Sequence, residues 1–104
     1  MVSLSRIELL ILLSVSEEPH HGYEIMQRVG ILSDGRQKLG AGTLYVGIKR
    51  LVQGGLLIED EQLRTNRRRY YVLTPSGRQA AADKLASYES LVKWARAHGF
   101  GGVA

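Results

Sequence analysis

The feature that most constrains the fold of this chain is a change of hydrophobic period at the glycine pair Gly54-Gly55. Before this pair, apolar side chains recur at intervals of three and four residues, as they do along one face of an α-helix. After it come short runs rich in β-branched and aromatic residues, 56–58 and 70–73, which suit the pleated surface of a sheet. The sequence therefore predicts several helices followed by a β-hairpin.

Three helices are expected before the glycine pair. Ser5 and Glu8 have the spacing of a capping box, which predicts a first helix from there to about residue 16. A second helix is expected to begin near His21 and to stop at residues 33–35, and a third to run from about residue 41 to the glycine pair. On the third helix, a 100° spacing per residue puts an apolar stripe on one side. Its members are Leu44, Ile48, Leu51 and Val52.

A long final helix is expected after the hairpin. Thr74 and Pro75 supply an N-cap followed by proline at the first helical position, where a missing amide costs nothing. The polar residues 59–69 between the two strands are too many for a tight turn and project into solvent. The final helix carries two apolar stripes. The first is Ala81, Leu85, Tyr88, Val92 and Ala95, and the second is Leu91, Trp94 and His98.

Size and charge narrow the class of protein. A chain of 104 residues makes one small domain and excludes a large multi-lobed enzyme. Its net charge of +4 favours an anionic partner, and the charge is uneven, because residues 1–35 carry −3 and the rest +7. The absence of cysteine excludes a disulfide framework and fits a cytoplasmic protein. The apolar run at residues 9–13 is far shorter than the ~20 residues that span a bilayer.

The order of helices, hairpin and long helix predicts a mainly α fold with a small β-hairpin: a winged helix-turn-helix plus a long C-terminal helix. In such modules the helix after the turn enters the DNA major groove, and the hairpin, or wing, lies against the flanking backbone. We expect residues 1–74 to form the DNA-binding domain, 75–98 a dimerisation helix and 99–104 a tail. The expected partner is a pseudo-palindromic double-stranded DNA.

Residues for DNA binding come from three places. The third helix offers small groups and a hydroxyl for phosphates at its start, Val46 for a thymine methyl, and longer polar side chains for base edges. The hairpin adds arginines near its tip, and two tyrosine hydroxyls are further candidates for phosphate contacts. The full set is Tyr23, Gly42, Thr43, Tyr45, Val46, Lys49, Arg50, Gln53, Arg64, Arg67, Arg68 and Arg69.

Five motifs in order along residues 7–78 closely resemble the PadR-like transcriptional regulators. They are residues 21–25 (His-Gly-Tyr-Glu-Ile), 42–45 (Gly-Thr-Leu-Tyr), 49–51 (Lys-Arg-Leu), 55–57 (Gly-Leu-Leu) and 71–77 (Tyr-Val-Leu-Thr-Pro-Ser-Gly). The resemblance implies a homodimeric regulator, usually a repressor, whose last helix packs against helices of the partner, including the first. It also implies release from DNA by a small aromatic or drug-like molecule bound near that interface.

The apolar first and last helices supply the expected dimer contacts and effector site. Dimerisation is predicted for Leu9, Leu12, Leu13, Leu85, Tyr88, Val92 and Ala95. Trp94 lies off the main stripe with Leu91 and His98, and a two-fold axis would pair it with its mate. Two indoles could then flank a planar aromatic effector by stacking. The alternative is that Trp94 only packs within the dimer.

Two other classes of function stay open at this stage. One is a winged-helix module for protein interaction, with incidental basic charge, and the other is a small-ligand sensor that binds no DNA. A metal site is conceivable on one helical face that would carry His20, His21 and Glu24. These residues are better explained as structural residues at the start of the second helix. We therefore expect no metal and no cofactor. The sequence also lacks a serine nucleophile elbow and a phosphate-binding glycine loop, which argues against an enzyme.

Overall fold

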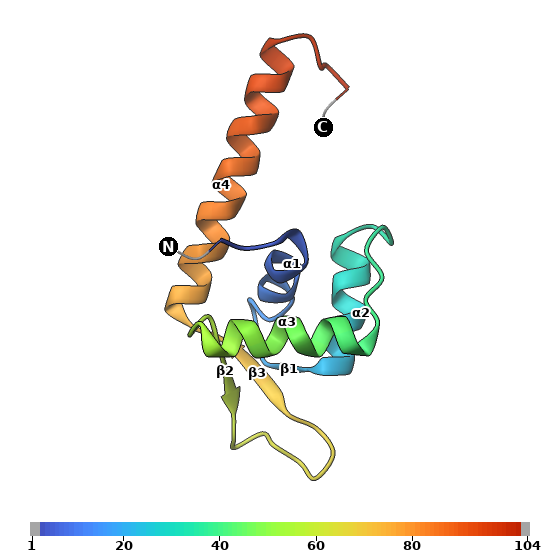
Figure 1. Cartoon of the computed structure of the whole chain (residues 1–104), viewed down its shortest axis with the longest axis vertical. Coiled ribbons are helices and arrows are strands. Elements are labelled where there is room, and N and C mark those ends of the chain that lie inside the picture. Colours follow the sequence, from blue (N-terminus) through green and yellow to red (C-terminus); the bar gives the residue numbers. More distant parts are fainter. Residues whose placement is uncertain (1–2, 103–104) are drawn as a thin grey trace.

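The computed structural model describes residues 3–102 of the chain. Its elements are α1 (Arg6–Ser14), β1 (His20–His21), α2 (Gly22–Leu32), α3 (Ala41–Gln53), β2 (Leu57–Asp60), β3 (Tyr70–Leu73) and α4 (Pro75–Ala97). Figure 1 shows α1, α2 and α3 in one cluster, with the β2–β3 hairpin projecting from one side and α4 extending from the other. This arrangement confirms the predicted winged-helix fold. Residues 103 and 104 of the predicted tail lie outside the described residues.

Local sequence signals set the ends of the helices as expected. At α1 the Ser5 hydroxyl accepts a hydrogen bond from the Glu8 amide at 3.1 Å, and the Glu8 carboxylate accepts one from the Ser5 amide at 2.9 Å. At α4 the Thr74 hydroxyl accepts from the Gly77 amide at 2.9 Å. After α3, Gly55 adopts a φ of 75°, a left-handed conformation that glycine tolerates best.

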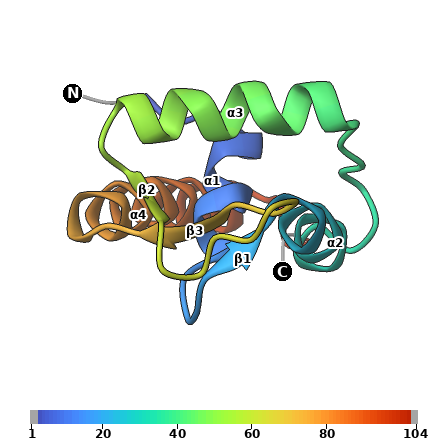
Figure 2. The same cartoon turned by 90° about the horizontal axis from the view of Figure 1, so that it is seen from below.

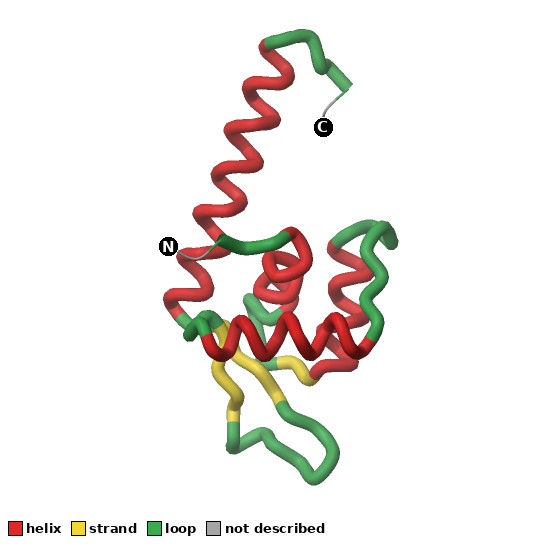
Figure 3. The backbone as a smooth tube through the Cα atoms, viewed as in Figure 1, coloured by secondary structure: helices red, strands yellow, loops and turns green. Residues whose placement is uncertain are grey.

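The sheet has one strand more than the sequence predicted. The strands are antiparallel in the order β1-β3-β2, with His20 opposite Tyr71 and Leu57 opposite Leu73. Figure 3 shows how short these strands are beside the long connection between β2 and β3. The sequence missed β1 because a two-residue strand has no readable period. Its pairing partner also lies some fifty residues further along the chain.

The hydrophobic core lies around α1, which packs against α2, α3 and α4. From α3 the core takes Leu44, Ile48 and Leu51 as predicted, but Val52 is 38% exposed. Gly47 completes the buried face instead. A Cβ built at Gly47 would lie 3.0 Å from Cδ1 of Ile11, so α1 and α3 approach closely along this line.

Two of the residues predicted for dimerisation, Leu9 and Leu12, lie on α1 inside the protomer's own core. Leu9 and Leu12 are only 3% and 0% exposed within one protomer. Their surface is covered by the protomer's own core rather than left for a partner. Leu13 is half-buried and packs at the edge of that core. The apolar first helix is thus explained mainly by its central place in a single chain.

The helix α4 packs on the core as far as Tyr88, which is partly buried against it. Gly77 and Ala81 are its buried residues, and a side chain at Gly77 would collide with the carbonyl oxygen of Leu56. The rest of the helix projects away, and the molecule measures 53 × 28 × 22 Å. Leu85, Leu91 and Trp94 are exposed large hydrophobic residues of this helix.

Candidate nucleic-acid interface

The outer arc of α3 is exposed along its whole length. Its members are Gly42, Thr43, Val46, Lys49, Arg50 and Gln53. Figure 2, seen from below, shows α3 running across the molecule beside the hairpin, with α4 behind the hairpin. Val46 is an apolar side chain left 62% exposed in the middle of the arc. This face combines an apolar group with donors of the kind that contact base edges.

Lys49 and Arg50 differ in their surroundings. The Nε of Arg50 lies 3.8 Å from Oε2 of Glu8, whose side chain is largely buried at the start of α1. Within residues 3–102, Lys49 is in no ion pair. The full charge of Lys49 is therefore available to a partner, whereas Arg50 also offsets the charge of a buried carboxylate.

The start of α3 has free backbone donors. Gly40 is its N-cap and makes no side-chain capping hydrogen bond. The amides of the first helical turn, including those of Gly42 and Thr43, have no partner within the helix. Such amides, with the positive end of the helix dipole, favour an anion. No acidic residue occupies this first turn.

The hairpin connection returns its arginines toward the helices. Thr65 closes a turn in which its hydroxyl accepts from the Arg68 amide at 3.0 Å, and its own amide donates to the Arg68 carbonyl at 3.0 Å. Of the four predicted wing arginines, Arg67, Arg68 and Arg69 border a cavity against α2 and α3, and Arg64 does not. The Nε of Arg69 also lies 3.6 Å from Oε1 of Glu59.

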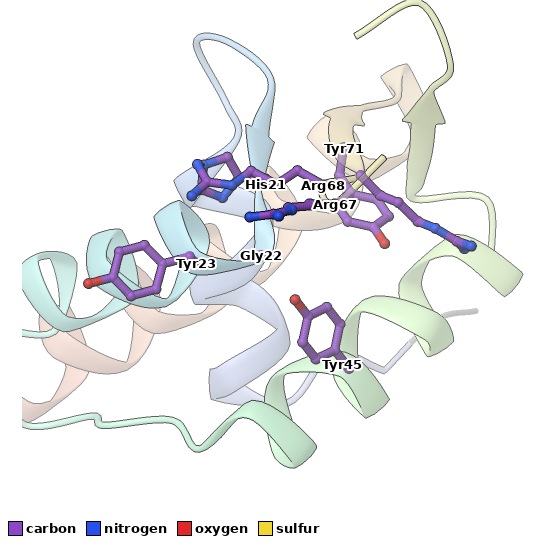
Figure 4. Close-up of a pocket in the computed structure, with 8 residues that line it drawn as sticks. His21, Gly22, Tyr23, Tyr45, Arg67, Arg68 and Tyr71 are labelled. Atoms are coloured by element: carbon purple, nitrogen blue, oxygen red, sulfur yellow. The ribbon is translucent and has the colours of Figure 1, made fainter. Parts of the chain in front are cut away.

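We call this cavity the wing cleft. It has a volume of about 350 Å³ and is lined by basic and aromatic residues of three separate elements. These are His21, Gly22 and Tyr23 from β1 and α2, Tyr45 from α3, and Arg67, Arg68, Arg69 and Tyr71 from the hairpin. Figure 4 shows the hydroxyls of Tyr45 and Tyr71 directed into the space beside the arginines, while the ring of Tyr23 points away.

Three residues of the wing cleft were missed by the sequence reasoning: His21, Gly22 and Tyr71. A Cβ at Gly22 would lie 2.5 Å from the Tyr45 hydroxyl, so this glycine lets α3 and the start of α2 meet. Tyr71 is buried, and burial followed by the nearby charge of Glu59 raises the pKa of its hydroxyl. Its alternation with Tyr70 in the predicted strand was the available signal, because neighbouring strand residues face opposite sides.

His21 joins the start of α2 to the wing. Its Nδ1 accepts a hydrogen bond from the Glu24 amide at 3.3 Å, and its Nε2 lies 2.8 Å from Nη1 of Arg68. The ring also stacks edge-on against Tyr70 at 5.3 Å between centroids. Burial lowers the pKa of His21, as do the charges of Arg68 and His20, while Glu24 opposes the shift. The pKa of His21 is thus lowered overall, which favours the neutral form of the ring.

The carboxylate of Glu24 lies close to the rings of both His20 and His21. Its Oε1 accepts from the His21 amide at 3.2 Å and lies 3.3 Å from Nδ1 of His20 and 3.3 Å from Nε2 of His21. Burial raises the pKa of Glu24, but the hydrogen bonds and the histidine charges outweigh it, so the pKa is lowered overall. Among the described residues, no group of three or more histidine and carboxylate side chains is arranged to hold a metal ion.

The predicted effector residues lie on the projecting end of α4. Trp94 and His98 are stacked with ring centroids 4.0 Å apart and an interplanar angle of 15°. Nδ1 of His98 donates to the Trp94 carbonyl at 2.8 Å. An open hollow of about 370 Å³ lies beside Leu91, Val92, Trp94, Ala95 and Phe100, and His98 is outside it. The structure thus places Trp94 and Leu91 in the wall of the hollow, while His98 stacks on Trp94 outside it.

The remaining predicted dimer residues, Leu85, Tyr88, Val92 and Ala95, follow one another along α4. Leu85 is exposed, and the other three are half-buried in the protomer.

In the described part of the chain, no helix combines the length and apolar character needed to cross a bilayer.

Comparison with known proteins agrees with this geometry. The model of the "Transcriptional regulator PadR-like family" matches residues 11–83. A transcriptional regulator from Clostridium thermocellum is 26% identical with a TM-score of 0.73, and the alignment covers 88% of this chain and 93% of that one. A PadR-like transcription factor from Bacteroides fragilis is 27% identical, with a TM-score of 0.73 and 89% of each chain covered.

A third solved structure is Bacillus subtilis PadR in complex with operator DNA. It is 20% identical with a TM-score of 0.68, covers 80% of this chain and 48% of that chain, and at this identity shows the shared fold. A search of curated proteins gives no match. The matched family consists of transcriptional regulators and not of enzymes. With its winged-helix fold and the family match over residues 11–83, the chain belongs to the PadR-like family of transcriptional regulators.

Proposed function

We propose that the protein is a cytoplasmic, homodimeric repressor that binds a pseudo-palindromic operator through α3 and the wing. The observation that carries this proposal is the contact between the exposed arc of α3 and the wing: Lys49 and Gln53 line a second hollow together with Arg69 and Tyr71 of the wing cleft. Residues 1–74 act as the DNA-binding domain and residues 75–98 as the dimerisation helix. Bacillus subtilis PadR, which shares this fold, was solved in complex with operator DNA, and this supports DNA binding by the present chain.

Dimerisation through α4 is supported by what one protomer leaves exposed. Leu85, Leu91 and Trp94 on α4 and Phe100 just after it are all exposed large hydrophobic residues. Apolar surface of this extent favours burial against another surface, and a second copy offers an identical one across a two-fold axis. The edge of this proposed contact also includes four half-buried residues: Leu13, Tyr88, Val92 and Ala95.

We further propose that a small planar aromatic molecule relieves repression by binding beside Trp94. The open hollow with Leu91 supports this site, since its walls are apolar and one face of the indole is already stacked on His98. Because Trp94 is the only tryptophan, its fluorescence reports binding directly. Planar aromatics that release DNA should change that fluorescence, and release without any change would contradict the site.

The test of DNA recognition is selection of bound duplexes from a random pool by the full chain. Enrichment of one inverted repeat is expected, with half-site centres about 10 bp or a multiple apart. Binding should also weaken steeply with salt, because each neutralised phosphate adds about 0.9 to the slope of log affinity against log salt. A protein-interaction module or a DNA-independent ligand sensor would enrich no sequence and would contradict the proposal.

A further inference from the structure

We propose that the wing cleft seats one phosphate of the DNA backbone, and that His21 is the residue that positions Arg68 to bind it. This inference rests on the proposed function and makes it more specific. It assigns a role to His21, Gly22 and Tyr71, which are not part of the outer arc of α3. It also separates the arginines that line the cleft and bind one defined phosphate from Arg64, which lies outside the cleft.

The walls of the wing cleft match the chemistry of a phosphate. Three arginines and the hydroxyls of Tyr45 and Tyr71 line it, and none of its lining residues is acidic. Arginine forms charge-assisted hydrogen bonds with phosphate that are about twice as strong as neutral ones. The volume of about 350 Å³ exceeds about tenfold the ~30 Å³ that one water molecule occupies in the liquid. A phosphate and the adjoining backbone atoms of a DNA strand therefore fit.

The contact between His21 and Arg68 places the guanidinium at the cleft. Nδ1 of His21 accepts a hydrogen bond from the Glu24 amide at 3.3 Å, and Nε2 lies 3.3 Å from Oε1 of Glu24. The same Nε2 lies 2.8 Å from Nη1 of Arg68. Because a guanidinium carries five N–H donors, the others stay available to a phosphate oxygen in the cleft. His21 therefore holds Arg68 in place through one nitrogen and leaves the rest of its donors to the anion.

The cleft is held in shape before DNA arrives. The turn closed by Thr65 fixes the backbone of Arg68 through two contacts of 3.0 Å. The absence of a side chain at Gly22 leaves room for the Tyr45 hydroxyl, which a Cβ would approach to 2.5 Å. Groups ordered in advance lose less entropy on binding. The cleft can therefore add affinity at one phosphate position without ordering the whole wing.

The first experiment compares Arg68→Gln with Lys93→Gln, which removes the same charge from an exposed position on α4. Affinity for a duplex selected by the wild-type chain is measured from 0.05 to 0.3 M salt. Loss of one phosphate contact should reduce the salt slope by about 0.9 and the affinity at 0.1 M salt about eightfold. Lys93→Gln should leave both near wild type. Equal effects of the two variants would overturn the cleft, while failure of the wild type to bind any duplex would instead overturn the proposed function.

The second experiment replaces the phosphates of that duplex one at a time by neutral methylphosphonate. The wild-type protein should lose affinity when one particular phosphate in each half-site is neutralised. In Arg68→Gln and Tyr45→Phe, neutralising that phosphate should no longer change the affinity. His21→Asn keeps an oxygen for the helix cap but removes the Nε2 contact, so it should reduce the loss at the same position while melting close to wild type. A wild-type pattern in His21→Asn would refute the positioning role.

Free phosphate is the other source of this chemistry. Inorganic phosphate exchanged for chloride at constant ionic strength should compete weakly, because it lacks the other contacts of the DNA. Saturable binding of inorganic phosphate that needs Arg68, with no phosphate position of the duplex coupled to Arg68, would overturn the assignment to DNA.

Discussion

Gly77→Ala should destabilise the junction between α4 and the rest of the winged-helix fold. A Cβ at this position collides with the carbonyl oxygen of Leu56 and lies 2.8 Å from Cδ1 of Leu73. The carbonyl cannot rotate away as a side chain would. It also accepts a hydrogen bond from the Thr74 amide at 3.2 Å, so making room for the methyl group breaks this bond as well.

The magnitude follows from these contacts. Overpacking of a tight site costs about 1–3 kcal/mol, and losing the hydrogen bond between Thr74 and Leu56 adds about 1 kcal/mol. The better helix propensity of alanine returns at most about 1 kcal/mol. The free energy of unfolding should therefore fall by about 1–3 kcal/mol. For a domain of this size the Tm should fall by roughly 5–20 °C.

Thermal unfolding followed by circular dichroism tests this expectation. All variants are compared at one protomer concentration, because the proposed dimerisation would make Tm depend on concentration. The matched control is Gly30→Ala on α2, where an added Cβ meets nothing within 4 Å and the Tm should rise slightly. A Tm of Gly77→Ala equal to or above that of wild type would refute the reasoning about the junction.

Three further predictions concern the DNA-binding face. Gly22→Ala should change Tm little, because the Tyr45 ring can turn into solvent. It should nevertheless weaken DNA binding severalfold, and a large loss of Tm with unchanged affinity would contradict this. Arg50→Ala should lower the urea midpoint more than Lys49→Ala, because it leaves the buried carboxylate of its partner without a counter-charge, and equal midpoints would count against that pairing. The lowered pKa of His21 means that the unfolded chain binds its proton first, so stability should fall as pH drops below about 6.5; a His21→Asn variant with the same pH dependence between 7.5 and 5.5 would disprove the assignment.

Features encoded within a few neighbouring residues were predictable from the sequence. The capping box of Ser5 and Glu8, the N-cap at Thr74 and the left-handed Gly55 depend on contacts between residues at most a few positions apart. The exposed arc of α3 follows from helical spacing alone. These signals were enough to place α3, the wing and the basic surface in the correct order.

Features that depend on close approach of distant segments were not predictable. The strand β1, the burial of Gly47 under α1 and the meeting of Gly22 with Tyr45 each need a partner far away in the sequence. The cover of Leu9 by its own chain depends on distant segments in the same way. Apolar composition predicts burial, but only the packing shows whether the cover is the same chain or a second copy.

The most direct test of the central claim is the binding of Lys49→Ala/Arg50→Ala to the selected duplex and to a scrambled duplex of the same composition. The two side chains lie on the exposed arc of α3, so we predict that the double variant loses the preference for the selected duplex and keeps only weak, salt-sensitive binding to both. Its dimer, measured by sedimentation, should be unchanged. Wild-type affinity and preference in this double variant would contradict the claim that α3 is the reading helix.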